Sequence, residues 1–198
     1  MGIRYATLCS GIGCAELAAD PLGWECLFQS EVDPFACAVL VDRFPLTPNV
    51  GDMTLLAARI RAGEFDNWLP DVLVAGTPCQ AWSVAGNGES LNDPRGRITL
   101  ELVLVLDAID VRRSAEGSRP CTLVWENVPG VFSKDDNPFG CLVGALVGAD
   151  GAVDPFGRRG KWPRAGMVRG PRRALCWRIL DAQWFGVAQR RRRVFLVA

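Results

Sequence analysis

The sequence predicts an α/β fold in which helices cover both faces of a mostly parallel, doubly wound sheet. Short apolar runs of strand length alternate with longer helix-compatible segments up to residue 147. Several runs lack polar alternation, as is typical of parallel strands covered on both sides. The chain has 198 residues, 49% of them hydrophobic, which suffices for the core of one domain. We therefore expect a single domain over residues 1–198.

The expected strands are apolar runs that end at turn residues, and they lie at 4–8, 26–29, 72–75, 122–125 and 194–197. The expected helices lie at 14–19, 34–44, 55–62, 98–109, 139–147 and 172–180. The second of these helices begins at Pro34, because proline is tolerated in the first turn of a helix. A Gly/Pro/Arg-rich loop is expected at 148–171, and a loop of this length is usually functional or disordered rather than a mere connection.

The composition excludes several classes of function. No apolar stretch approaches the ~20 residues that a membrane span needs, and the N-terminus lacks the pattern of a signal peptide. We therefore expect a cytoplasmic protein without a membrane partner. The chain contains no histidine, and its 8 cysteines form no CxxC pair, so a metal site is disfavoured and histidine-based catalysis is excluded. All cysteines except Cys79 are assigned to packing in a reduced core.

Charge is divided unevenly along a chain whose formal net charge is zero. Residues 158–198 contain 12 Lys and Arg residues and one acid, which gives +11, whereas residues 1–157 contain 10 basic and 21 acidic residues, which gives −11. A C-terminal part this basic suits a phosphate backbone. A solvated basic face that neutralises the acidic remainder explains the same pattern, and charge alone does not separate the two interpretations.

Cys79 is the strongest candidate for a catalytic residue. The apolar run 71–76 leads into Thr77-Pro78-Cys79-Gln80, which predicts a buried strand ending in a turn that presents one cysteine. This signal is weak by itself, because buried cysteines usually act as small hydrophobic residues. A second apolar run ends in Glu126-Asn127-Val128, and the carboxyl ends of neighbouring strands line one crevice in an open α/β sheet. Cys79, Glu126 and the basic cluster 189–193 are therefore expected to meet there.

Glycines and a carboxylate beside the first two strands indicate a nucleotide-like cofactor. Gly11 and Gly13 follow the first strand, and Glu31 follows the second, 20 residues after Gly11. This spacing places a carboxylate against ribose hydroxyls while the glycines let the backbone approach the ligand. Glu16 stands where a third glycine would be, and its charge would repel a pyrophosphate from the helix start. S-adenosylmethionine, a nucleoside without phosphates, is therefore favoured over NAD or FAD, although glycine can serve the turn alone.

Seven short motifs occur in an order that resembles the DNA cytosine-5 methyltransferases of bacteria and their phages. They cover nearly the whole chain and are Leu8-Cys9-Ser10-Gly11-Ile12-Gly13, Ser30-Glu31-Val32-Asp33, Gly51-Asp52-Met53-Thr54, Gly76-Thr77-Pro78-Cys79-Gln80, Asp93-Pro94-Arg95-Gly96, Glu126-Asn127-Val128 and Gln189-Arg190-Arg191-Arg192-Arg193. The resemblance implies a Rossmann-like, S-adenosylmethionine-dependent methyltransferase fold. It also implies methyl transfer to carbon 5 of cytosine in double-stranded DNA, as in restriction-modification systems.

The resemblance also assigns the site residues. Cys79 would add to carbon 6 of a flipped-out cytosine, Glu126 would hydrogen-bond ring nitrogen 3 and the amino group, and Arg191 would help to hold the base and stabilise the adduct. The base and the DNA would also be contacted by Gln80, Ser83, Arg95, Gln189 and Arg193. S-adenosylmethionine would be bound by Ser10, Gly11, Ile12, Gly13, Glu31, Val32, Asp52, Met53, Pro78 and Leu100. Simpler interpretations exist for Asp52, as a helix cap, and for Arg190 and Arg192, as phosphate contacts.

Two features depart from the family pattern. Cys9 stands where the family usually has a phenylalanine that stacks on adenine. The chain also ends on an apolar strand without an evident target recognition region, so a C-terminally incomplete fold is expected. A truncation, one half of a split enzyme and a compact variant all explain this ending. In the second case a complementary polypeptide would carry target recognition.

Three other functions stay open. A catalytic half could bind cofactor, DNA or a partner chain without turnover. A nucleotide-binding oxidoreductase is weakened by Glu16 and leaves the Pro-Cys-Gln motif unexplained. The same cysteine adduct could also serve another modification at carbon 5, or act on a deoxycytidine nucleotide.

Overall fold

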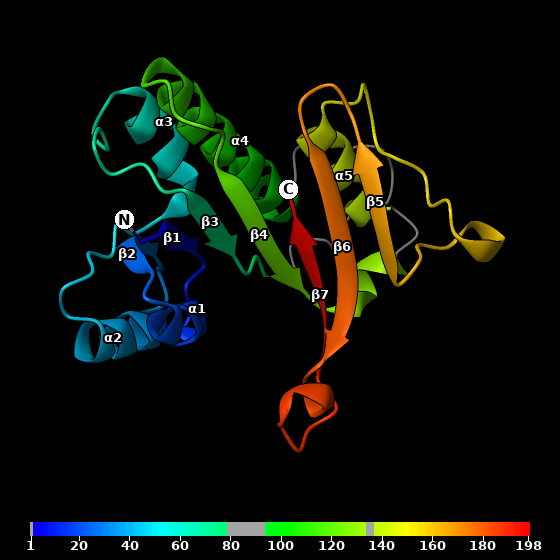
Figure 1. Ribbon diagram of the computed structural model, residues 1–198, viewed down its shortest axis with the longest axis horizontal. Helices are drawn as coiled ribbons and strands as arrows, with labels where there is room; N and C mark the ends of the chain where they lie inside the picture. Colours follow the sequence, from blue (N-terminus) through cyan, green and yellow to red (C-terminus); the bar gives the residue numbers. More distant parts are fainter. Residues whose placement is uncertain (1, 79–93, 134–136) are drawn as a thin grey trace. The chain divides into compact units, whose positions relative to one another are not determined.

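The structure is a computed structural model that describes residues 2–78, 94–133 and 137–198 (Figure 1). The chain divides into two compact units, which are described separately. The first comprises Met1–Gly76 and Glu101–Leu123, and the second comprises Thr77–Leu100 and Val124–Ala198. The single domain over residues 1–198 stays a prediction.

The first unit contains parallel strands in the order β2-β1-β3. β1 (Arg4–Leu8) pairs in parallel with β2 (Glu25–Ser30) and with β3 (Val72–Ala75). Leu8 lies opposite Ser30 on one side and Ala75 on the other, so the three strands end at the same edge. These strands bury successive residues, as predicted for a sheet covered on both faces.

The helices of the first unit confirm most of the predicted elements. They are α1 (Cys14–Ala19), η1 (Asp20–Leu22), α2 (Pro34–Arg43), η2 (Met53–Leu55), α3 (Leu56–Arg61) and α4 (Pro94–Ala115), of which α4 begins in the second unit. α2 starts where predicted, because Pro34 fits its first turn and the Asp33 side chain accepts the Ala36 N–H. α4 is longer than the predicted helix at 98–109. The prediction was too short because the residues at both ends of α4 are polar and show no apolar periodicity.

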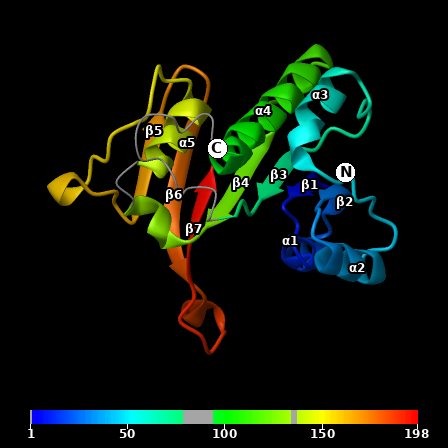
Figure 2. The same ribbon diagram turned by 180° about the vertical axis from the view of Figure 1, so that it is seen from behind.

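Antiparallel strands form the second unit, in the order β4-β7-β6-β5. They are β4 (Thr122–Asn127), whose first two residues belong to the first unit, β7 (Arg192–Val197), β6 (Ala174–Asp181) and β5 (Ala165–Arg169). α5 (Pro138–Val147) covers one face of these strands, as Figure 2 shows from behind. Short 3-10 helices also occur at η4 (Pro129–Phe132), η5 (Arg158–Gly160) and η6 (Ala182–Phe185).

Two sequence-based expectations for this unit are wrong. The predicted helix at 172–180 is the strand β6, and the predicted loop at 148–171 contains the strand β5. In β6, Leu175 and Trp177 are buried whereas Cys176 and Arg178 are exposed. This alternation has the period of a strand with one covered face. The period of two therefore outweighs the helix-compatible composition.

Aromatic packing explains why β5 forms within the glycine-rich segment. The Trp177 ring lies across Gly166, where an added Cβ would come within 2.4 Å of the ring. The Trp177 indole N–H donates to the Pro163 carbonyl, and the Trp162 indole N–H donates to Asn137 Oδ1. Phe139 contacts both tryptophan rings edge to face. The segment before β5 is thus held by buried aromatic rings rather than by local propensity.

The packing role predicted for the cysteines is wrong at three positions. Cys14, Cys141 and Cys176 are exposed, because they lie on outward-facing positions of α1, α5 and β6. Cys121 is buried, in agreement with the prediction. Separately, none of the described helices combines the length and the hydropathy required to cross a membrane.

Candidate functional site

The turn after β1 requires glycine at two positions. Gly11 and Gly13 have φ values of +56° and +86°, in the left-handed region that glycine adopts readily. A Cβ on Gly13 would lie 2.3 Å from Cε2 of Phe44, so Phe44 also excludes any larger residue there. A Cβ on Gly11 would meet no atom within 4 Å. The backbone at Gly11 is therefore open to a ligand.

Glu31, directly after β2, is fixed beside this turn. Its Oε2 accepts the Gly11 N–H at 2.7 Å, and its Oε1 accepts the N–H groups of Val32 at 2.8 Å and Asp33 at 2.9 Å. Asn49 binds the backbone of Glu31 at both its N–H and its carbonyl. A carboxylate has about four acceptor sites, so the Glu31 carboxylate is held in one orientation and can still accept hydroxyl groups.

Cys9 and Asp52 lie close to Glu31. Burial, together with the negative charges of Glu31 and Asp52, raises the pKa of the Cys9 thiol to about 12. The Cys9 sulfur lies 3.4 Å from the sulfur of Met53. Asp52 also caps η2, because its Oδ1 accepts the Thr54 N–H at 2.8 Å. The first unit thus gathers two carboxylates and two sulfur atoms next to an open glycine turn.

We expect Cys9 to resist alkylation by iodoacetamide at pH 8. The raised pKa keeps the Cys9 thiol protonated there, so its thiolate population is on the order of 10³-fold below that of an ordinary cysteine. Cys14 is exposed and serves as the matched control. Peptide mass spectrometry should find Cys14 labelled while Cys9 is intact, and both labelled after unfolding in guanidinium. Equal labelling of the two in the folded protein would contradict the raised pKa of the Cys9 thiol.

The turn that leads to Cys79 is held by β4. The Trp125 indole N–H donates to Thr77 Oγ1 at 2.8 Å, and Asn127 Nδ2 donates to the Thr77 carbonyl at 2.9 Å. All three side chains are buried. The chain two residues before Cys79 is therefore fixed to the residues on either side of Glu126 in β4. Cys79, Gln80 and Ser83 lie outside the described residues, as does the side chain of Arg95.

Glu126 forms an ion pair with Arg193. The Arg193 Nε lies 2.6 Å from Glu126 Oε1, and these side chains are 22% and 33% exposed respectively. Phe195 lies opposite Glu126 in the β4–β7 pair, and Arg193 is on the same face because it is two residues away. The partly buried pair is thus set by the strand register.

The other residues of the predicted base-binding cluster are placed differently. Arg191 has an exposed side chain, and its backbone N–H donates to Asp181 Oδ1 at 3.1 Å. Gln189 is also exposed. The structure therefore pairs Glu126 with Arg193 rather than with Arg191.

The remaining cofactor candidates differ in exposure. In the first unit, Ser10 hydrogen-bonds the Ser30 N–H and Thr7 Oγ1, Met53 is buried, and Ile12 and Val32 are exposed. In the second unit, Pro78 and Leu100 are exposed. The sequence interpretation missed Trp125 and Asn127, although a polar residue ending a buried strand signals a buried hydrogen bond.

Known proteins are similar to nearly the whole of this chain. A family model described as C-5 cytosine-specific DNA methylase matches residues 3–143. A protein of Escherichia phage P1 named DNA N-6-adenine-methyltransferase is 48% identical over 213 residues, covering 98% of this chain and 28% of its own length. The Type II methyltransferase M.HgiBI of Herpetosiphon aurantiacus is 30% identical over 199 residues, covering 98% of this chain and 36% of its own. The chain therefore spans about a third of the length of these relatives.

A solved structure supports the fold assignment. It is a prophage-encoded E. coli protein described as a DNA modification methyltransferase. The match covers 99% of this chain and 46% of the length of that protein, with a TM-score of 0.68 and 20% sequence identity. This likeness confirms the Rossmann-like α/β fold predicted from the sequence.

Proposed function

Because the chain belongs to the family of C-5 cytosine-specific DNA methylases, we propose that it is the catalytic part of an enzyme that methylates carbon 5 of cytosine in double-stranded DNA. One observation carries this proposal. The strand β4 holds the turn before Cys79 through Trp125 and Asn127, and it presents Glu126, paired with Arg193, between them. An acid on a strand that also holds the turn before the proposed nucleophile suits covalent chemistry on a base.

Carbon 5 of cytosine needs activation before it can accept a methyl group. In the proposed reaction the Cys79 thiolate forms a bond to carbon 6, and the electron pair of the carbon 5–carbon 6 double bond becomes available at carbon 5. After methylation, loss of the carbon 5 proton and departure of the thiolate restore the double bond. The target base must first leave the helical stack to reach such a pocket.

Glu126 and Arg193 act on the opposite edge of the base. The Glu126 carboxyl group is proposed to accept a hydrogen bond from the amino group and to transfer a proton to ring nitrogen 3, where negative charge develops during thiolate addition. It takes this proton back when the thiolate leaves. The guanidinium of Arg193 fixes the carboxyl group through the 2.6 Å contact. Arg193 is thus a positioning residue. Arg191, whose side chain is exposed, is left to contact the base or the adjoining phosphate.

The residues around the glycine turn fit S-adenosylmethionine. The Glu31 carboxylate is oriented by the Gly11 N–H and retains acceptor capacity for ribose hydroxyls. Asp52 lies near Glu31, since the negative charges of both residues raise the pKa of the Cys9 thiol. The two carboxylates also suit a sulfonium cation electrostatically. The exposed Val32 follows Glu31 and is available to the adenine ring. When bound, S-adenosylmethionine supplies the methyl group.

Adenine methylation is the second candidate, because of the name of the phage P1 relative. This chain spans only 28% of that protein, so the rest of its length can carry the activity that is named. The exocyclic nitrogen of adenine also needs no thiolate addition, and an adenine reaction would leave the Cys79 motif without a role. Cytosine is therefore favoured.

The identity of the methylated base tests this proposal. The chain is incubated with labelled S-adenosylmethionine and duplex DNA, and the digested nucleosides are separated by mass spectrometry. We expect 5-methylcytosine. N6-methyladenine would overturn the proposal, and cofactor binding without transfer would favour a catalytic half that does not turn over alone.

Target recognition is proposed to lie outside these 198 residues, in the same protein or in a complementary polypeptide. The relatives extend well beyond the part that this chain spans, which supports this division. The relatives come from bacteria and a phage, whose DNA is found in the bacterial cytoplasm. This origin supports a cytoplasmic location for the present protein.

A further inference from the structure

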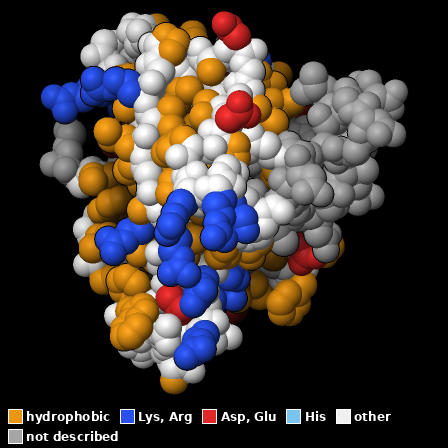
Figure 3. Space-filling model, turned by 90° about the vertical axis from the view of Figure 1, so that its right-hand side faces the viewer, with side chains coloured by type: hydrophobic (Ala, Val, Ile, Leu, Met, Phe, Trp, Pro, Cys, Tyr) orange, Lys and Arg blue, Asp and Glu red, His pale blue; other side chains and the backbone are white. Residues whose placement is uncertain are grey.

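A basic groove with exposed aromatic rings lies in the second unit, outside the proposed base-binding pair. Its volume is about 740 Å³, and its lining includes residues from η4, the segment before β5, β6, η6 and β7. The residues that matter here are Lys161, Arg164, Arg178, Trp184, Phe185 and Arg192. Figure 3 shows Lys and Arg side chains gathered beside hydrophobic ones on this side of the molecule.

The charge of the groove is strongly positive among the residues that the structure describes. Its lining contains four cationic side chains and one acid, Asp181. The Asp181 carboxylate already accepts from the Arg191 N–H, from Gln183 Nε2 and from Arg192 Nε. Within the described part of the chain, no acid pairs with Lys161 or Arg164. The groove therefore attracts an anion that the described part of the chain does not supply.

The aromatic rings make the groove more specific than a basic face. Trp184 is 80% exposed and Phe185 is 67% exposed, and both lie on the short helix η6 at the tip of the β6–β7 hairpin. Large rings left in water beside cationic groups are typical of surfaces that stack nucleic-acid bases and contact phosphates. An anion with flat rings, rather than an isolated phosphate, fits this combination.

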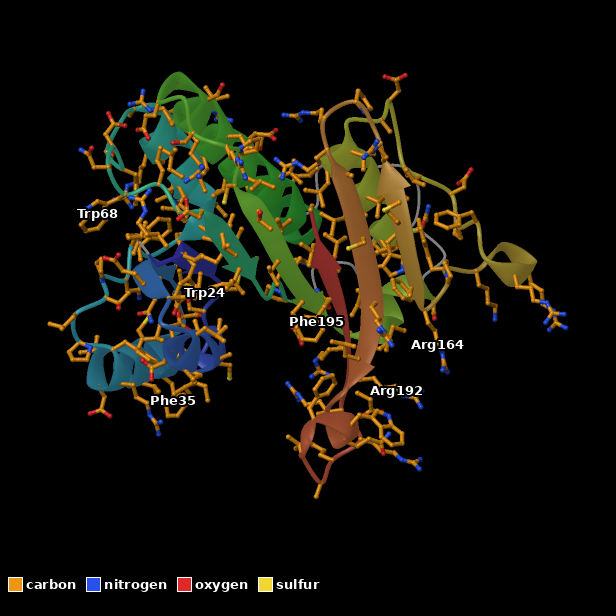
Figure 4. All side chains as sticks on the ribbon, in the orientation of Figure 1. Trp24, Phe35, Trp68, Arg164, Arg192 and Phe195 are labelled. Atoms are coloured by element: carbon orange, nitrogen blue, oxygen red, sulfur yellow. The ribbon has the colours of Figure 1, made fainter. Side chains whose placement is uncertain are left out.

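The strand β7 links the groove to the proposed base-binding pair. Neighbouring residues of a strand point to opposite faces. Arg193 therefore reaches Glu126 on one face, while Arg192 reaches Asp181 in the groove on the other. Arg164 and Arg192 lie toward the same end of the β5–β6–β7 strands (Figure 4). A strand of DNA in the groove would thus run past the end of β7 that also carries Arg193, on the face of the strands opposite to the Glu126–Arg193 pair.

We propose that this groove binds the DNA strand that flanks the target cytosine. Lys161, Arg164 and Arg192 contact its phosphates, and Trp184 stacks on one of its bases. The inference rests on the proposed function for the choice of DNA over other polyanions. It goes beyond that function by assigning a DNA contact to residues outside the family motifs, namely Lys161, Arg164 and Trp184.

Removal of two groove charges tests the phosphate contacts. The variant is Lys161→Gln/Arg164→Gln, and the control is Arg158→Gln/Arg159→Gln, which removes the same charge from exposed residues outside the groove lining. Binding to labelled duplex DNA is followed by fluorescence anisotropy at several salt concentrations. We expect the groove variant to lose about 10-fold in affinity and to lower the salt slope by about 2, because each phosphate contact contributes about 0.9. The control should lose less than about twofold.

A second variant tests the stacking contact. Trp184→Ala should weaken DNA binding by about 5-fold or more, since base stacking contributes roughly 1–3 kcal/mol. Trp68→Ala, at an exposed tryptophan of the first unit, should leave the affinity unchanged. All six substituted residues are exposed, so circular dichroism should report unchanged folding of the four variants.

The outcomes separate this inference from the proposed function. Equal losses in the groove variant and its control, or no binding of DNA by the unsubstituted chain, would overturn the inference. Selective loss of DNA affinity in a chain that makes no 5-methylcytosine would support the groove while overturning the cytosine activity. Normal methylation and normal DNA affinity in the groove variants would overturn the groove alone.

Discussion

Cys79→Ala is expected to abolish methyl transfer, lowering the rate by about 10⁴-fold or more, as removal of a covalent nucleophile typically does. Without a sulfur to add at carbon 6, carbon 5 does not become nucleophilic. Binding of S-adenosylmethionine should be nearly unchanged, because the substitution leaves its proposed ligands Glu31 and Asp52 in place. The two quantities are measured by label transfer to DNA and by isothermal titration calorimetry.

A matched control separates the loss of the nucleophile from the loss of any thiol. Cys14→Ala removes an exposed sulfur from α1 and should leave transfer intact. A trap sharpens the experiment: fluorine at carbon 5 of the target cytosine is not lost as a proton is, so the covalent adduct accumulates and survives denaturing electrophoresis. The adduct should form with Cys14→Ala and not with Cys79→Ala. Methylation that survives in Cys79→Ala would rule out the covalent mechanism.

Local rules predicted the first unit well because its elements are specified by nearby residues. The Asp33-Pro34 pair fixes the start of α2, and the short apolar run at β3, followed by Gly76, favours a buried strand. The same rules gave wrong predictions for the strands β5 and β6. Their conformation depends on Trp177 packing over Gly166 and Phe139, contacts between residues distant in sequence. Local composition around 165–180 therefore could not predict them.

In the candidate site, too, the sequence predicted which residues take part but not which of them contact each other. The motifs singled out Glu126 and the arginine run, but which arginine meets Glu126 depends on the register between β4 and β7. A shift of one residue in that register would bring Arg192 rather than Arg193 to the Glu126 face. The hydrogen bonds from Trp125 and Asn127 to Thr77 likewise join positions about 50 residues apart. Sequence spacing gives no access to such contacts.

The Glu126–Arg193 pair should behave as one catalytic unit. Glu126→Gln is expected to lower kcat by about 10²–10⁴-fold, because an amide cannot transfer a proton to ring nitrogen 3 as a carboxylic acid can. Arg193→Gln should produce a smaller loss, since the carboxylate remains but its orientation by the guanidinium is gone. The double variant should be little slower than Glu126→Gln alone, because a positioning residue has no further effect once its target is removed.

The arginine run supplies its own control for this cycle. Arg190→Gln removes the same charge from an exposed neighbour, so it should raise KM for DNA and leave kcat within about threefold, as expected for a phosphate contact. Effects of Glu126→Gln and Arg193→Gln that multiply in the double variant would mean that the two side chains act independently. In that case the ion pair would be a structural link between β4 and β7, and orientation of the carboxylate would have to come from Gln189, Arg191 or the DNA itself.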